Sequence, residues 1–215
     1  MTKKSVLMLA PILGLVLPLG AMTVGDDETG KAKGQKAELQ AAIGKPAPEF
    51  TLTDAAGKEH KLSQYRGKIV VLQWTNHTCP FIKYHEGSAK TMQSTFKGFE
   101  GKSVVWLAID SSHYCEEKIE GIRGWIKEKE IPFPILLDAA GSVGRVYAAK
   151  STPHMFVIDR EGILQYRGAI DDDPGLGGEA SRNYVKDAVN ALLKGSAVSQ
   201  KETKSYGCSV KYKKS

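Results

Sequence analysis

The stretch that decides the fold is residues 68–82, KIVVLQWTNHTCPFI. Residues 68–75 contain four consecutive aliphatic side chains and are apolar on both faces, as is typical of a strand buried in the centre of a sheet. Three polar residues follow, and Cys79-Pro80 opens a stretch that we expect to be helical over about 81–99. The pattern therefore predicts a cysteine at the junction between a buried strand and the start of a helix.

The rest of the chain continues this alternation. We expect a second buried strand at 103–109, a helix at 119–129, a strand at 135–137 and a short helix near 143–149. Such alternation predicts parallel strands with right-handed crossovers. Residues 155–158 and 163–167 are joined by only four residues, which permits only an antiparallel hairpin. A further hairpin, 50–53 with 60–62, precedes the first central strand, and a last helix runs over about 180–193.

The N-terminal residues have the layout of a secretory signal. Lys3 and Lys4 precede an uncharged apolar run over residues 6–21, which contains two prolines and is shorter than the ~20 residues needed to cross a bilayer. We predict a signal peptide at 1–22, a linker at 23–42, the folded domain at 43–194 and a tail at 195–215. The protein is then exported, to a periplasm or outside the cell, and meets a membrane only if the signal remains uncleaved.

Charge and composition exclude some functions. The net charge is +6, and much of the charge that would remain after removal of Lys3 and Lys4 comes from five lysines of the tail. No basic stripe interleaved with aromatics crosses the body, so we expect no nucleic-acid partner. His77, His85, His113 and the acidic triplet 171–173 show no strong metal-site spacing, and the triplet before Pro174-Gly175 is typical of a polar turn. We expect no metal and no cofactor.

Cys79 is the residue best suited to chemistry. Free backbone N–H groups at a helix start favour a thiolate and lower a cysteine pKa below its usual value of about 8.5. His77 would add to this effect if protonated. The competing interpretation is a small buried residue without chemistry, since free cysteine is among the most buried residue types.

A second signature, Ser151-Thr152-Pro153-His154, precedes the strand at 155–158. Here the sequence resembles the thioredoxin superfamily, and the resemblance implies a cis bond before Pro153 and a Thr152 backbone that faces a partner's disulfide. Together with residues 43–50, 74–79 and 166–171, it resembles the redoxin (alkyl hydroperoxide reductase / thiol-specific antioxidant) family, in its peroxiredoxin-like branch. The implied fold is an α/β thioredoxin-like fold, a mixed sheet flanked by helices with an N-terminal hairpin extension.

Departures from these families limit what carries over. The second cysteine of the thioredoxin pair is replaced by Ile82, so a local dithiol is absent. Peroxiredoxins have a threonine and a proline where this chain has Asn76 and Leu72, which argues against efficient peroxide reduction. We expect Trp74, Asn76 and Phe81 to form the walls of the substrate site.

A single reactive thiol needs a second thiol to complete a redox cycle. The odd set of cysteines offers Cys208, in an aromatic patch of the tail, and Cys115, in the loop after the second buried strand; an external thiol is the third option.

Two hypotheses follow from the sequence. The first is an exported thiol-dependent oxidoreductase or peroxiredoxin-like antioxidant protein, in which Cys79 attacks a protein disulfide or a peroxide, Cys208 or Cys115 resolves the product, and Thr152 and Pro153 shape the site. The second is a non-catalytic module that binds a partner protein or a metal and carries a structural disulfide.

Overall fold

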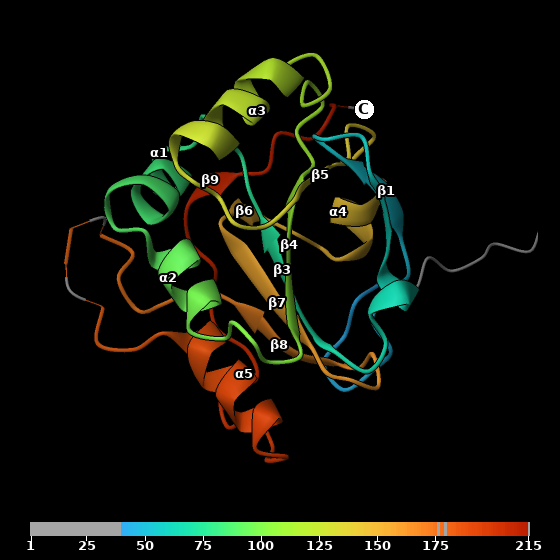
Figure 1. The fold of residues 1–215 in the computed structure, drawn as a ribbon, viewed down its shortest axis with the longest axis vertical. Helices are drawn as coiled ribbons and strands as arrows, with labels where there is room; N and C mark the ends of the chain where they lie inside the picture. The colour runs from blue at the N-terminus through green and yellow to red at the C-terminus, as the bar shows by residue number, and fades with distance from the viewer. Residues whose placement is uncertain (1–39, 176, 179, 215) are drawn as a thin grey trace, which may run out of the picture. The chain divides into compact units, whose positions relative to one another are not determined.

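A seven-stranded mixed sheet forms the centre of the computed structural model, which describes residues 40–175, 177–178 and 180–214 (Figure 1). The strand order is β2-β1-β5-β4-β3-β7-β8. Strands β3, β4 and β5 are parallel, and β1, β7 and β8 join them in antiparallel pairs. The strands are β1 (Thr51–Asp54), β2 (Glu59–Lys61), β3 (Ile69–Trp74), β4 (Val104–Asp110), β5 (Ile135–Leu137), β7 (His154–Ile158) and β8 (Leu164–Gly168).

Alternate residues of the buried strands serve two apolar cores, one on each face of the sheet. Ile69 and Val71 of β3 face a core that also contains residues of α2, α3 and α5. Val70 and Leu72 face the other, which α4 and residues 41–50 complete. Both faces are covered, as the unbroken aliphatic run in β3 predicts. The thioredoxin-like α/β fold with its N-terminal hairpin is confirmed.

The helices follow the sequence prediction with two corrections. They are α1 (Pro80–Ile82), a π-helical turn η2 (Lys83–Ser88), α2 (Thr91–Lys97), α3 (Ile119–Glu128), α4 (Ser142–Val146) and α5 (Tyr184–Leu193), with a 3-10 turn η1 (Leu62–Tyr65) after β2. The single helix expected at 81–99 is wrong, because Lys90 has φ 50° and interrupts it. The last helix begins at Tyr184 rather than near 180, because the Asn183 side chain caps it by accepting a hydrogen bond from the Lys186 N–H at 2.8 Å.

The C-terminal arm, residues 195–214, packs along the folded domain. Its Val198 is 3% exposed, and its strand β9 (Cys208–Ser209) pairs antiparallel with β6 (Ser151–Thr152) in a separate two-stranded sheet. Figure 1 shows the arm in red, running from α5 to β9 beside α1.

The signal peptide predicted at 1–22 and most of the predicted linker lie outside the described residues. Within the part of the chain that the structure describes, no helix is long and apolar enough to cross a membrane.

Candidate active site

Cys79 lies where the sequence places it, immediately before α1 and after the loop that leaves β3. Its backbone N–H donates to the Asn76 carbonyl at 2.9 Å, and its own carbonyl accepts from the Lys83 N–H at 2.9 Å, which ties the residue into the first helical turn. Only 4% of Cys79 is exposed. The thiol is therefore held rigidly beneath the surface at a helix start.

Asn76 fixes the loop that carries Cys79. Its side-chain oxygen accepts from the Thr78 N–H at 2.8 Å and from the Thr78 hydroxyl at 2.6 Å. Its amide nitrogen donates to the Ser112 hydroxyl at 2.7 Å and to the Tyr114 hydroxyl at 3.0 Å. Asn76 thus joins the loops after β3 and β4, and its polar atoms are all engaged within the protein.

The Thr152–Pro153 segment faces the thiol. Its peptide bond is cis, as the resemblance implies. The Cys79 thiol donates a hydrogen bond to the Thr152 carbonyl, with 3.1 Å between Sγ and the oxygen. The structure thus brings Cys79 into contact with the Thr152–Pro153 segment, which lies more than seventy residues further along the chain.

Cys208 reaches the same place from the arm. It pairs with Thr152 in the β6–β9 ladder. The preceding Gly207 has φ +114°, and a Cβ on it would lie 2.2 Å from the Thr152 oxygen. Only glycine tolerates both this backbone conformation and this close approach. Gly207 therefore allows the arm to bring Cys208 beside Cys79.

The two thiols have opposite pKa shifts. Burial alone would raise the pKa of Cys79, but hydrogen bonds from the Cys208 thiol, the Thr152 side chain and the backbone of Ile82 and Cys208 outweigh it and lower the pKa. Burial raises the pKa of Cys208 to about 11, together with its hydrogen bond to Cys79 and the charge of that thiolate. The pair therefore favours a thiolate on Cys79 and a protonated Cys208.

Cys115 lies in a different environment. It is 1% exposed and packs in the core that faces α3, beside Ile122 and Ile135. Burial and the charges of Asp110 and Glu116 raise its pKa to about 12. Cys79 is not among the groups that shift the pKa of Cys115. This environment does not favour a disulfide between Cys79 and Cys115.

Tyr206 anchors the arm two residues before Cys208. Its hydroxyl donates to Asp171 and lies 3.0 Å from Nε2 of His85, and its ring lies 6.1 Å from that of Phe81. No sequence pattern predicts this cluster, because His85, Asp171 and Tyr206 are widely separated along the chain. The acidic triplet does form a turn, but Asp171 also holds the arm.

Three other expectations concern residues around Cys79. Trp74 is fully buried, packs against Tyr147 and donates to the Ser111 hydroxyl at 3.0 Å, so it supports the site from within the core. Phe81 is half-buried next to the arm. Burial lowers the pKa of His77, and so does the charge of Lys83; His77 is therefore neutral and adds no positive charge near Cys79.

Glu86 is a buried acid that sequence analysis missed. It is 0% exposed in η2 and accepts hydrogen bonds from Gln73, from Thr75 at 3.1 Å and from the Trp125 indole at 2.6 Å. Burial raises its pKa to about 7 despite these donors. A single sequence carries no signal for such an acid, since most glutamates are exposed.

A family model described as the AhpC/TSA family matches residues 43–167, which is more than half of the chain. The chain belongs to the AhpC/TSA family. The match includes Cys79 and Pro153 and ends before the arm. The resemblance seen in the sequence is thereby confirmed.

Known relatives agree with this assignment. The chain is 29% identical over 125 residues to the thiol-disulfide oxidoreductase ResA of Bacillus thuringiensis subsp. konkukian, an alignment that covers 58% of this chain and 68% of that protein. ResA of Geobacillus kaustophilus is 32% identical over 124 residues, covering 58% and 67%. The family and these names identify the chain as an oxidoreductase of the thioredoxin-like class.

Among solved structures, a hypothetical protein of Sinorhizobium meliloti 1021 superposes with a TM-score of 0.71 at 29% identity. The superposition covers 82% of this chain and 97% of that one. It extends over a larger share of the chain than the family model does.

Proposed function

We propose that this protein is a thiol-disulfide oxidoreductase in which Cys79 is the nucleophile and Cys208 is the resolving thiol. The observation that carries the proposal is the pairing of Cys208 with Thr152, whose carbonyl lies 3.1 Å from the Cys79 sulfur. Because Ile82 replaces the second cysteine of the usual local pair, the arm supplies the missing thiol from the other end of the chain.

In the first step the Cys79 thiolate attacks one sulfur of a substrate disulfide. A bond forms between Cys79 and that sulfur, the substrate S–S bond breaks, and the second substrate sulfur leaves as a thiolate that takes up a proton. The lowered pKa of Cys79 raises the fraction of the attacking group that is ionised. Thr152 and Pro153 form the wall against which the mixed disulfide lies.

The second step uses the coupling between the two thiols. Two of the causes that raise the pKa of Cys208 are its hydrogen bond to Cys79 and the charge of that thiolate. Both vanish once Cys79 is bonded to substrate, so the pKa of Cys208 falls at the moment when its thiolate is needed. Cys208 then attacks the Cys79 sulfur, closes a Cys79–Cys208 disulfide and releases the reduced substrate. An external dithiol reductant restores the pair.

A disulfide is favoured over a peroxide as the substrate. The position of the activating threonine of peroxiredoxins is held by Asn76, whose side-chain atoms are engaged with Thr78, Ser112 and Tyr114. Leu72, at the position of their proline, is fully buried within β3. Neither residue offers a hydrogen bond to a peroxide.

The place of action that we propose is outside the cytosol. The charged start and apolar run of residues 1–22 support export, and disulfide exchange through a persistent protein disulfide suits an oxidising compartment. Its partners are then proteins with disulfides or reactive thiols.

Trapping tests the roles of the two cysteines. The reduced full-length protein and its Cys79→Ser, Cys208→Ser and Cys115→Ala variants are mixed with one equivalent of oxidised insulin or of hydrogen peroxide, quenched with acid and mapped without reduction. With insulin we expect an intrachain Cys79–Cys208 peptide from the wild type and from Cys115→Ala, and a lasting mixed disulfide between Cys79 and insulin from Cys208→Ser. With hydrogen peroxide, which supplies no sulfur, we expect slower formation of the Cys79–Cys208 bond and a sulfenic acid on Cys79 in Cys208→Ser. A Cys79–Cys115 peptide, or no intrachain bridge, contradicts the assignment.

The same experiment separates catalysis from a structural disulfide. A catalytic bond is reduced by mild thiols and re-formed by substrate, whereas a structural bond resists mild reduction and is not consumed in turnover. A bridge that forms but never cycles would support the non-catalytic alternative.

A further inference from the structure

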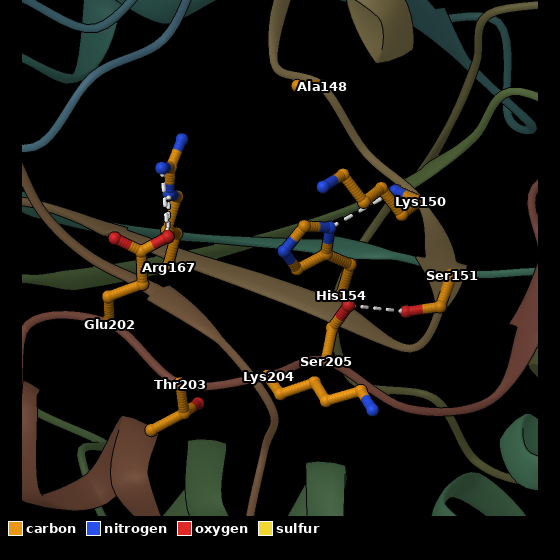
Figure 2. A pocket seen from close by; sticks show the side chains of 9 residues that line it. All are labelled: Ala148, Lys150, Ser151, His154, Arg167, Glu202, Thr203, Lys204 and Ser205. Atoms are coloured by element: carbon orange, nitrogen blue, oxygen red, sulfur yellow. Dashed lines mark hydrogen bonds and ion pairs between the residues drawn. The ribbon is translucent and has the colours of Figure 1, made fainter.

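A cavity of about 340 Å³ lies between the C-terminal arm and the strands β6 to β8 (Figure 2). Ser151, His154 and Arg167 line it from the sheet side, and residues 202–205 of the arm close the opposite side. Its size is in the range of small-molecule sites. None of the three cysteines lines it, so its chemistry is separate from that of Cys79.

His154 presents a fixed hydrogen-bond donor to this cavity. Its Nδ1 accepts from the Lys150 backbone N–H at 3.2 Å, so in the neutral ring the proton is on Nε2. The residue as a whole is 6% exposed, and no hydrogen bond to its Nε2 is formed within the part of the chain that the structure describes. Figure 2 shows Nε2 turned into the open space toward Arg167. An N–H that opens into a cavity on an otherwise buried ring suits a ligand that accepts hydrogen bonds.

The charges around the cavity are mostly positive. Lys150, Arg167 and Lys204 line it with a single carboxylate, Glu202. One oxygen of Glu202 accepts from both Nε and Nη2 of Arg167, at 2.9 and 2.8 Å, so these two residues balance each other. Within the described part of the chain, Lys150 and Lys204 have no acidic partner.

The protonation state of His154 agrees with the surplus of positive charge around the cavity. Burial, together with the charges of Arg167 and Lys150, lowers its pKa to about 4. The ring is therefore neutral near pH 7 and adds no positive charge to the cavity. A metal cation is disfavoured in this cavity, because the ammonium groups of Lys150 and Lys204 would repel it.

We propose that this cavity binds a small oxyanion, with one oxygen on the Nε2–H of His154 and its charge balanced by Lys150, beside the Arg167–Glu202 ion pair. Inorganic phosphate and the carboxylate of a small organic acid share this chemistry. The Ser151 hydroxyl, 2.8 Å from that of Ser205, joins the sheet and the arm at the edge of the cavity. The ligand thus lies at the seam where the arm meets the sheet.

The test follows the imidazole nitrogens of His154 by NMR in the reduced full-length protein at pH 7. Inorganic phosphate and, separately, succinate are titrated against sodium chloride at matched ionic strength. We expect a saturable shift of Nε2 with half-saturation below about 10 mM for at least one of the two, and none with chloride. Saturation by succinate alone identifies a carboxylate ligand, and saturation by phosphate identifies the general oxyanion class.

Lys150→Ala is the decisive variant, because Lys150 is exposed and its loss leaves the core intact. We expect half-saturation to rise at least ~5-fold in Lys150→Ala and to stay unchanged in Lys97→Ala, a matched change at an exposed lysine of α2. The absence of a saturable shift, or equal binding by both variants, overturns the proposal. Neither readout involves a thiol, so failure here leaves the proposed redox function untouched.

Discussion

Cys79 and Cys115 are both almost fully buried, yet burial has opposite outcomes for them. Around Cys79, the N–H groups of Ile82 and Cys208 and the Cys208 thiol donate hydrogen bonds, and the pKa falls. Around Cys115 burial raises the pKa to about 12, and the carboxylates of Asp110 and Glu116 add to the rise. The comparison teaches that the partial charges facing a buried thiol, rather than its depth, decide whether it is a nucleophile.

The largest expected difference between the two cysteines is in the rate at which their variants reduce insulin disulfides. We expect Cys79→Ala to lower the initial rate of insulin disulfide reduction by ~10³-fold or more, because the proposed nucleophile is lost. Cys115→Ala, which removes an equally buried thiol, is expected to change the rate less than about 2-fold. Similar losses in the two variants would erase the distinction between the cysteines.

The next effect is on the reactivity of the thiols themselves. We expect Cys79 to be alkylated by iodoacetamide with a midpoint below about pH 8.5, the usual value, and Cys115 to react at least ~100-fold more slowly at pH 7 in the folded protein. Mass spectrometry of quenched time points across pH measures both rates. In Cys208→Ala the pH midpoint for alkylation of Cys79 is expected to rise, because the hydrogen bond from the Cys208 thiol is lost. An unchanged midpoint would mean that Cys208 does not lower the pKa of Cys79.

Glu86 extends the comparison between the two buried thiols to a buried carboxyl group. Burial raises its pKa by more than the hydrogen bonds from Trp125, Gln73 and Thr75 lower it. Its pKa rises from 4.5 to about 7 in the folded protein. Because the pKa of Glu86 is higher in the folded than in the unfolded protein, protonated Glu86 contributes its full stability to the fold below pH 4.5. This contribution is lost as the pH rises through 7, and the free energy of unfolding falls by about 3 kcal/mol at most. Asp110, whose pKa burial raises to about 6, acts in the same direction.

Urea unfolding at pH 4.5 and pH 8 measures this loss. We expect the fall in the free energy of unfolding to be smaller in Glu86→Gln than in the wild type, and unchanged in Glu100→Gln, an exposed control. An equal fall in all three proteins would mean that Glu86 is not the titrating group.

The smallest expected effect concerns the contact between the arm and the Thr152 carbonyl. In Gly207→Ala a Cβ would lie 2.2 Å from that oxygen, so β9 must move away from β6. We expect Cys208 to be alkylated roughly 10-fold faster and the Cys79–Cys208 bond to form more slowly, with a loss of about 1–3 kcal/mol in stability.

Gly195→Ala is the matched control for this change. Gly195 also has a positive φ, +69°, but a Cβ there meets nothing within 4 Å. It therefore carries the backbone strain without the clash. If the two variants expose Cys208 equally, strain rather than the close approach to Thr152 is responsible.

The sequence by itself determined the central sheet, the placement of Cys79 and the family. Period-two and unbroken apolar runs report burial on one or both faces of a strand, and the cysteine-proline step marks a helix start, so these features are local. The interrupted helix after Cys79 was missed, because the positive φ of Lys90 follows from packing and not from its own preference.

The tertiary structure alone decided which groups surround each thiol. The cluster of His85, Asp171 and Tyr206, the buried Glu86 and the contact of Gly207 with Thr152 join segments far apart in the chain. Such contacts form because the sheet brings strand ends to one edge and the arm then packs over them. A pKa depends on the sum of burial, hydrogen bonds and charges in three dimensions, and no single sequence pattern contains that sum.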